Sequence, residues 1–143
     1  MSTKARKLRI LAILVLAFIW GNSLMPGSLS STITHFVLGL FGPIVPEASS
    51  AAGLTRKLAH ILEFMAMGIV LTHLRQELNK AWSLLFLAGL GIAIIDETIQ
   101  YFIEGRGSSL LDVWIDLFGF GLGVLFTHLI LRRRKKNTNP LHS

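Results

Sequence analysis

Four long stretches of the chain consist mainly of apolar residues, separated by shorter segments that are polar or rich in glycine. Each stretch is close to the roughly 17 to 25 residues that a helix needs to cross a bilayer. The pattern predicts an all-α membrane protein, a four-transmembrane-helix bundle with helices at about Leu8–Leu24, Leu54–Leu74, Ala81–Phe102 and Leu110–Leu131. Short connections make the last three sequential antiparallel neighbours, with turns at Arg75–Lys80 and Ile103–Ser109.

The segment Met25–Gly53, between the first two predicted spans, has a different pattern. Its apolar residues recur at helical spacing, and serines and threonines fall on the opposite face. The spacing predicts an amphipathic helix in the outer membrane interface, with an apolar face of Leu29, Ile33, Phe36, Val37, Leu40 and Phe41. Pro26-Gly27 and Gly42-Pro43 are its expected breaks, and the tail Asn137–Ser143 is expected to be disordered.

Composition supports the membrane interpretation. The 143 residues are 52% hydrophobic and 15% charged, with a mean hydropathy of +0.60, and we expect one domain, 1-143. The formal net charge is +6, but the bases cluster beside apolar runs, so we expect topological charge and no nucleic-acid partner. The chain has no cysteine, which excludes disulfides and thiolate chemistry.

The distribution of bases predicts orientation. Lysines and arginines precede the first span, occupy the turn Arg75–Lys80 and follow the last span, whereas only Arg56, Lys57 and Arg106 lie on the other side. By the positive-inside rule both termini are expected to be cytoplasmic. The first span has a basic start and an apolar core, like a signal peptide, but no small-x-small cleavage pattern follows it, so we expect an uncleaved anchor.

Polar residues on three predicted helices fall at similar depth in the outer half of the bilayer, because a helix rises about 1.5 Å per residue. Small residues share their faces, which favours close helix packing at Gly89, Gly119 and Gly123. Charged residues inside a membrane usually mark function. We therefore predict an outward-facing polar cavity lined by Lys57, His60, Glu63, Asp96, Glu97, Gln100, Arg106, Asp112 and Asp116.

Five of these residues are acids, and they face only two fixed cations and one histidine. Mutual pairing would leave acids without partners, so we favour a ligand-binding or catalytic cavity over purely structural ion pairs such as Lys57 or Arg106 with an aspartate. His60 and Asp96 are the candidates for acid/base catalysis. Lys57, His60 and Arg106 suit an anionic headgroup. His60, Glu63, Asp96 and Glu97 are hard metal ligands, but no HExxH-type signature is present, so we expect neither a metal nor another cofactor.

Three motifs occur together. Lys-x-x-His-x-x-Glu (Lys57, His60, Glu63) is followed by Asp-Glu-x-x-Gln (Asp96, Glu97, Gln100). Arg106 then precedes Asp-x-x-x-Asp (Asp112, Asp116) and the glycines Gly119 and Gly123. The chain from about Ile13 to Thr127 thereby resembles the VanZ-like family of small bacterial integral membrane proteins. That family is named for a protein that gives low-level resistance to the glycopeptide teicoplanin.

The resemblance implies a multi-pass protein of the bacterial cytoplasmic membrane with a role in the cell envelope. Two functions remain open. The first is a binding protein whose cavity takes a lipid or cell-wall headgroup or an amphiphilic antibiotic. The alternative is a small membrane enzyme acting by acid/base chemistry on a phospholipid or polyprenyl-linked precursor at the outer leaflet. Expected partners are membrane lipids and a lipid-linked or anionic headgroup ligand. Transport is the remaining alternative, which four helices could support only as a homo-oligomer.

Overall fold

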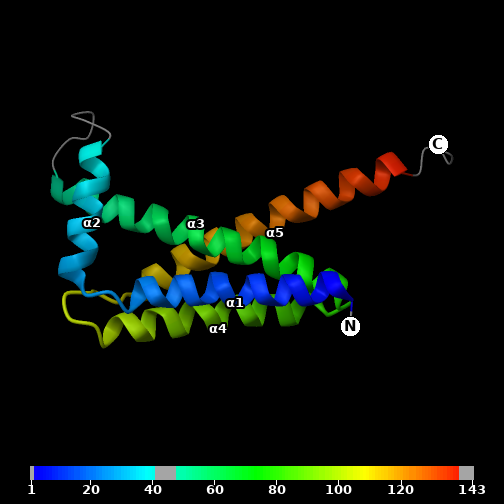
Figure 1. Ribbon diagram of the computed structural model, residues 1–143, viewed down its shortest axis with the longest axis horizontal. Coiled ribbons are helices and arrows are strands. Elements are labelled where there is room, and N and C mark those ends of the chain that lie inside the picture. The colour runs from blue at the N-terminus through cyan, green and yellow to red at the C-terminus, as the bar shows by residue number, and fades with distance from the viewer. Residues whose placement is uncertain (1, 41–47, 139–143) are drawn as a thin grey trace.

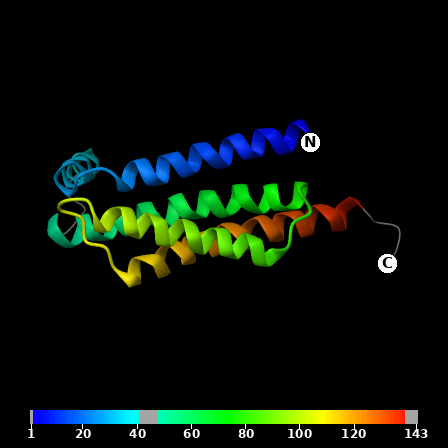
Figure 2. The same ribbon diagram turned by 90° about the horizontal axis from the view of Figure 1, so that it is seen from below.

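The computed structural model describes residues 2–40 and 48–138, and the surroundings of side chains for 2–36 and 53–134. The described chain forms five helices and no strand: α1 (Thr3–Ser23), α2 (Gly27–Leu40), α3 (Ala48–Glu77), α4 (Trp82–Tyr101) and α5 (Leu110–Thr138). Helices α1, α3, α4 and α5 run lengthwise beside one another, and α2 turns away at one end (Figures 1 and 2). The predicted all-helical class is confirmed.

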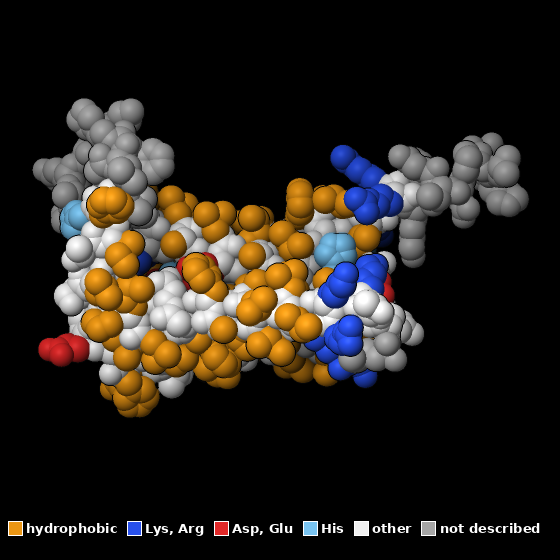
Figure 3. Space-filling model, in the orientation of Figure 1, with side chains coloured by type: hydrophobic (Ala, Val, Ile, Leu, Met, Phe, Trp, Pro, Cys, Tyr) orange, Lys and Arg blue, Asp and Glu red, His pale blue; other side chains and the backbone are white. Residues whose placement is uncertain are grey.

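Among the residues that the structure describes, three segments are long and apolar enough to cross a membrane: Gly53–Glu77, Trp82–Tyr101 and Leu110–Arg134. Helix α1 meets the same test only together with Gly27–Phe36, from which it is bent by 104°. The structure thus supports a helical membrane protein with three spans, or four if that bent pair is one span. Large apolar side chains cover the flanks of the bundle (Figure 3), as a lipid-facing surface requires.

The helices extend beyond the predicted apolar stretches because polar residues continue the same turns. Helix α1 begins at Thr3 rather than Leu8, and Ser2 caps it by accepting a hydrogen bond at Oγ from the Ala5 N–H at 3.0 Å. Helix α3 begins six residues before the predicted Leu54. Helix α5 continues through Thr138, so it includes the first two residues of the predicted tail; the remainder of that tail lies outside the described residues.

Helix α2 occupies the place of the predicted amphipathic helix. Ser30 is buried, whereas Leu29, Ile33 and Phe36 are exposed. The side chains of Val37 and Leu40, together with Phe41 and Gly42-Pro43, lie outside the described surroundings. Placement of α2 in the membrane interface remains a prediction.

The first residue of α2 packs against the loop between α4 and α5. The Gly27 N–H donates a hydrogen bond to the Glu104 carbonyl at 3.1 Å. A Cβ added to Gly27 would lie 2.0 Å from the Gly105 carbonyl oxygen, and Gly105 itself has a φ of +72°. Only glycine fits this contact. The bend after α1 is thereby held against the α4–α5 loop.

Glycines also bring α3 and α5 into backbone contact. A Cβ on Gly119 would lie 2.5 Å from the Ile61 carbonyl oxygen, and one on Gly123 would lie 2.1 Å from that of Met65. On α3, Gly68 has the same relation to the Phe120 carbonyl oxygen, at 2.3 Å. Such contacts allow helices in lipid to approach closely.

The apolar core lies beside this crossing. Phe64, Met67 and Phe120 are almost completely buried, and Ile19 of α1 and Ala93 of α4 belong to the same cluster. A Cβ on Gly89 of α4 would lie 2.7 Å from the ring of Phe120, so this glycine makes room for the phenylalanine. The core therefore joins all four lengthwise helices.

The two ends of the bundle differ in charge. The start of α1, the α3–α4 turn and the end of α5 lie together, and most lysines and arginines gather there (Figure 3). At this end Lys4 forms an ion pair with Glu77, and Arg75 lies over the ring of Trp82, 3.9 Å from its centroid. The end of α1, the start of α2 and the α4–α5 loop lie at the opposite end. The cytoplasmic orientation of the termini remains a prediction.

Candidate functional site

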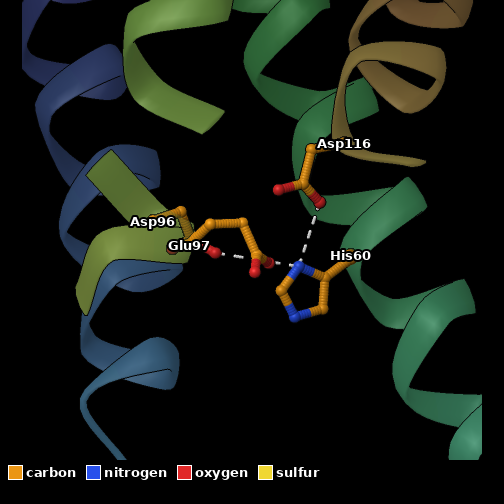
Figure 4. Close-up of side chains that lie close together, drawn as sticks. All are labelled: His60, Asp96, Glu97 and Asp116. Carbon is orange, nitrogen blue, oxygen red and sulfur yellow. Dashed lines mark hydrogen bonds and ion pairs between the residues drawn. The ribbon is translucent and has the colours of Figure 1, made fainter. Parts of the chain in front are cut away.

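Four side chains from three helices converge in the half of the bundle opposite its basic end (Figure 4). They are His60 on α3, Asp96 and Glu97 on α4, and Asp116 on α5, and all four are buried. Each offers one potential metal-ligand atom, and these atoms lie within 4.8 Å of one another. The packing of these helices therefore brings together residues from all three sequence motifs.

His60 is the only base in this group, and its contacts are directional. Its Nδ1 lies 3.0 Å from Asp116 Oδ1 and 3.8 Å from Asp96 Oδ2. Figure 4 shows the second ring nitrogen pointing away from the carboxylates. A carboxylate on one ring nitrogen orients an imidazole and leaves the other nitrogen for proton transfer, which is the geometry of a general base with its orienting group.

Asp96 links α4 to the end of α1. The Ser23 hydroxyl donates to Asp96 Oδ1 at 2.6 Å, and the Gln100 amide donates to Asp96 Oδ2 at 2.8 Å. Glu97 accepts from the same amide at 3.3 Å and from the Ser109 N–H, just before α5, at 3.0 Å. Both carboxylates are therefore held in place by neutral donors, which orient them without cancelling their charge.

Two further polar residues, Glu63 and Arg106, form hydrogen bonds with residues at the end of α1. The side-chain amide of Asn22 donates to Glu63 Oε1 at 2.9 Å. Arg106 donates from Nε to the Met25 carbonyl at 3.0 Å and from Nη2 to the Asn22 carbonyl at 2.6 Å. The last carbonyls of a helix lack intrahelical partners, so Arg106 satisfies the end of α1. Burial lowers the pKa of Arg106, yet a guanidinium stays charged at any physiological pH.

A polar cavity of about 90 Å³ adjoins the four-residue cluster. Exposed Arg56 and Lys57 form part of its wall, and half-buried Asp112 forms another part. The complete lining is Gly53, Arg56, Lys57, His60, Glu97, Gln100, Gly107, Asp112, Ile115 and Asp116. Cations thus line the exposed part of the cavity, and buried acids lie deeper.

Of the predicted site residues, Glu63, Asp96 and Arg106 do not line this cavity, although all three form hydrogen bonds with the end of α1 beside it. The sequence left open an alternative in which Lys57 or Arg106 forms a structural ion pair with an aspartate. Within residues 2–36 and 53–134, neither Lys57 nor Arg106 is paired with Asp112 or Asp116.

A second, larger space of about 590 Å³ lies between α1, α2 and α3. It is mainly apolar, and its lining is Ala17, Phe18, Gly21, Asn22, Met25, Ser30, Ile33, Thr34, Thr55, Arg56 and Ala59. Arg56 therefore lines both this apolar groove and the polar cavity. It also lines a third space of about 290 Å³, beside Gly27 and Gly105.

Sequence reasoning assigned neither Arg56 nor Asn22 to the site. The sequence signal for Arg56 is its place beside Lys57, one helical turn before His60. The signal for Asn22 is its place beside Ser23 at the end of an apolar helix. Neither signal shows which way a side chain points, because that depends on how α1 and α2 pack against α3.

Comparison with known proteins agrees with the motifs. No curated protein and no solved structure matches the chain significantly. A sequence model described as VanZ/LLP1 matches residues 8–131, which include every predicted site residue. The chain therefore belongs to the VanZ/LLP1 family.

Proposed function

We propose that this protein binds a membrane amphiphile with an anionic headgroup, holding the headgroup at the polar cavity and the hydrocarbon chain in the apolar groove. The observation that carries the proposal is the position of Arg56, which lines both spaces. If the phosphate of an amphiphile contacts Arg56, its headgroup lies at the polar cavity and its hydrocarbon chain lies at the apolar groove. Membrane phospholipids and lipid-linked cell-wall precursors share this chemistry.

Charge supports an anionic headgroup. Arg56 and Lys57 are both exposed, and no ion pair joins either to an acid among the described side chains. Lysine and arginine at a membrane surface attract anionic lipids by about 1 kcal/mol each. The neighbouring groove is lined by Phe18, Met25 and Ile33 among others, which suits an acyl or prenyl chain.

The basic end of the bundle supports an orientation for this binding. Positive residues around the α3–α4 turn and the ends of α1 and α5 favour a cytoplasmic position for that end. The polar cavity then faces the outer leaflet, so we propose a role in the cell envelope. Altered sensitivity to the glycopeptide teicoplanin on deletion is one expected consequence, because envelope amphiphiles include the precursors that glycopeptides bind.

The test uses the purified full chain in detergent, titrated with phosphatidylglycerol or phosphatidylcholine and followed by native mass spectrometry. We expect tighter binding of phosphatidylglycerol, and about fivefold weaker binding for each charge removed in Arg56→Gln and Lys57→Gln, because about 1 kcal/mol is lost per base. Lys80→Gln, an exposed base in the α3–α4 turn, is the matched control and should bind like the wild type. Equal binding of both lipids, or an equal effect of Lys80→Gln, contradicts the proposal.

The contact between His60 and Asp116 favours a second function, acid/base catalysis on a phospholipid or polyprenyl-linked precursor. The 3.0 Å contact orients the imidazole, and its other nitrogen points away from the carboxylates (Figure 4). Lipid and cell-wall-precursor mass spectrometry of cells carrying wild type, a deletion or His60→Ala tests this function. An enzyme predicts the same altered lipid species in the deletion and in His60→Ala cells with normal protein levels, and unchanged profiles rule it out.

A further inference from the structure

We infer that His60, Asp96, Glu97 and Asp116 form a binding site for one divalent transition-metal ion. The inference goes beyond the proposed function and does not depend on it, because it uses the buried side chains behind the polar cavity rather than the exposed bases. Four potential ligand atoms from three helices lie within 4.8 Å of one another. The ligands of a tetrahedral zinc ion are roughly 3.3–3.6 Å apart, so the widest pair has to close by about 1.2–1.5 Å.

The first argument for a cation is charge. Three of the four residues are acids, and none of the three is more than 5% exposed. The donors found on Asp96 and Glu97 are a hydroxyl, an amide and a backbone N–H, which are neutral. A protonated His60 would supply one positive charge against three carboxylates. Buried charge without compensation is very costly, and a divalent ion supplies the missing positive charge directly.

The second argument is an unpartnered atom. Asp116 is completely buried, and its Oδ2 has no hydrogen-bond partner in the part of the chain that the structure describes. Figure 4 shows the Asp116 carboxylate directed toward the other three side chains, with Oδ1 occupied by His60. A buried acceptor that lacks a donor is rare in proteins. The unpartnered Asp116 oxygen lies in the cluster of potential ligands, where it could bind a metal ion.

The arrangement around the ligands also fits a metal site. Carboxylate ligands are usually held by hydrogen bonds from a surrounding layer of residues. Ser23 and Gln100 supply such bonds to Asp96, and the Ser109 N–H supplies one to Glu97. These donors fix the carboxylates while leaving each oxygen a second lone pair for an ion.

The donor set indicates the kind of ion. One imidazole with three carboxylates suits Zn²⁺ or Mn²⁺ better than Mg²⁺ or Ca²⁺, which take oxygen ligands almost exclusively. Nδ1 of His60 is the ring nitrogen that faces the acids. A metal ion on Nδ1 takes the place of a proton there, so binding releases a proton wherever that nitrogen is protonated.

The test is equilibrium dialysis of the purified full chain against Zn²⁺ or Mn²⁺ in excess Mg²⁺, with bound metal measured by plasma mass spectrometry. We expect one ion per chain in the wild type and at least tenfold weaker binding in Asp116→Asn and His60→Gln. Glu63→Gln is the matched control, because it also removes a half-buried acid on α3 near His60 but lies outside the cluster. It should bind like the wild type, as should Arg56→Gln, which tests the lipid proposal separately.

A spectroscopic measurement on the wild type keeps the inference testable even if a variant fails to fold. Pulsed electron paramagnetic resonance of the Mn²⁺-loaded chain should show coupling to one imidazole nitrogen, and added Zn²⁺ should remove the signal. The inference is wrong if the wild type retains no stoichiometric metal, if Asp116→Asn that elutes as a single species binds equally well, or if no nitrogen coupling is seen.

Discussion

Helix α3 meets α5 on one side and α1 on the other, and the two contacts are built differently. Against α5, glycines bring backbone onto backbone at Gly119 and Gly123. Against α1, the hydrogen bonds and ion pairs lie near the two ends, Asn22 to Glu63 and Lys4 to Glu77, and a groove of about 590 Å³ lies along α1, α2 and α3. The first contact fixes the spacing of His60 and Asp116, and the second leaves room for a ligand.

The difference teaches which parts of the site are rigid. A contact between backbones cannot be relaxed by turning a side chain, so the positions of His60 and Asp116 follow from the helix crossing itself. The end of α1, by contrast, is held by individual side chains, including Arg106 and the hydroxyl of Ser23 on Asp96. Single substitutions should therefore disturb the two sides to different extents.

The largest effect is expected for Gly123→Ala in the α3–α5 contact. The new Cβ would lie 2.1 Å from the Met65 carbonyl oxygen, so the helices must separate. Overpacking against a rigid backbone should cost about 3 kcal/mol, and the helix propensity of alanine returns roughly 1 kcal/mol, so we expect a net loss of about 2 kcal/mol. Thermal or denaturant unfolding of the purified protein in detergent measures this loss.

Gly21→Ala on α1 is the matched control, because a Cβ there has nothing within 4 Å. It should leave stability unchanged or raise it by up to about 1 kcal/mol, through helix propensity alone. If both glycine variants lose stability equally, the contrast between the closed and the open side of α3 is wrong.

A smaller effect is expected for Arg106→Lys, which keeps the charge but not the planar fork that reaches two carbonyls. Losing one of these bonds should cost about 1–2 kcal/mol. Because the bonds hold the end of α1, hydrogen exchange should show roughly 5- to 30-fold less protection in its last turn. Amides of α5 around Gly123 should keep their protection, and an unchanged last turn of α1 would contradict the assigned role of Arg106.

The smallest effect is expected for Glu77→Gln, which removes the ion pair with Lys4 at the other end of α1. Lys4 is largely exposed, with 68% of its side-chain surface accessible, and exposed ion pairs contribute about 0–1 kcal/mol. Unfolding in low and high salt should give similar midpoints for variant and wild type. A loss comparable to that of Arg106→Lys would show that α1 is anchored at its basic end as well.

Much of this architecture was predictable because apolar stretches and helical periodicity are properties of single segments. Depth along each helix predicted that residues of α3, α4 and α5 would lie close together, and His60, Asp96, Glu97 and Asp116 do converge. The helix ends were less predictable, since hydropathy marks the apolar part of a helix, whereas Ser2 caps α1 through a hydrogen bond.

The role of Arg106 was not predictable from its motif. Its charge suggested a contact with acids or with an anionic ligand, but the structure places its donors on the carbonyls of Asn22 and Met25. The apolar groove was missed for a related reason. Its walls come from α1, α2 and α3, and α1 is apolar over most of its circumference, so its sequence does not show which face meets α3.

The contacts of Arg106 also constrain the order in which the protein can be completed. Met25 and Asn22 precede Arg106 by 81 and 84 residues, and Ser23 precedes Asp96 by 73. Because a chain is synthesised from its N-terminus, α1 leaves the ribosome before the residues that hold its end. Glu63 follows with α3, whereas Asp96 and Arg106 emerge only with the end of α4 and the loop after it. The contacts of Ser23 with Asp96 and of Arg106 with the end of α1 can therefore form only after α4 and the α4–α5 loop have been translated.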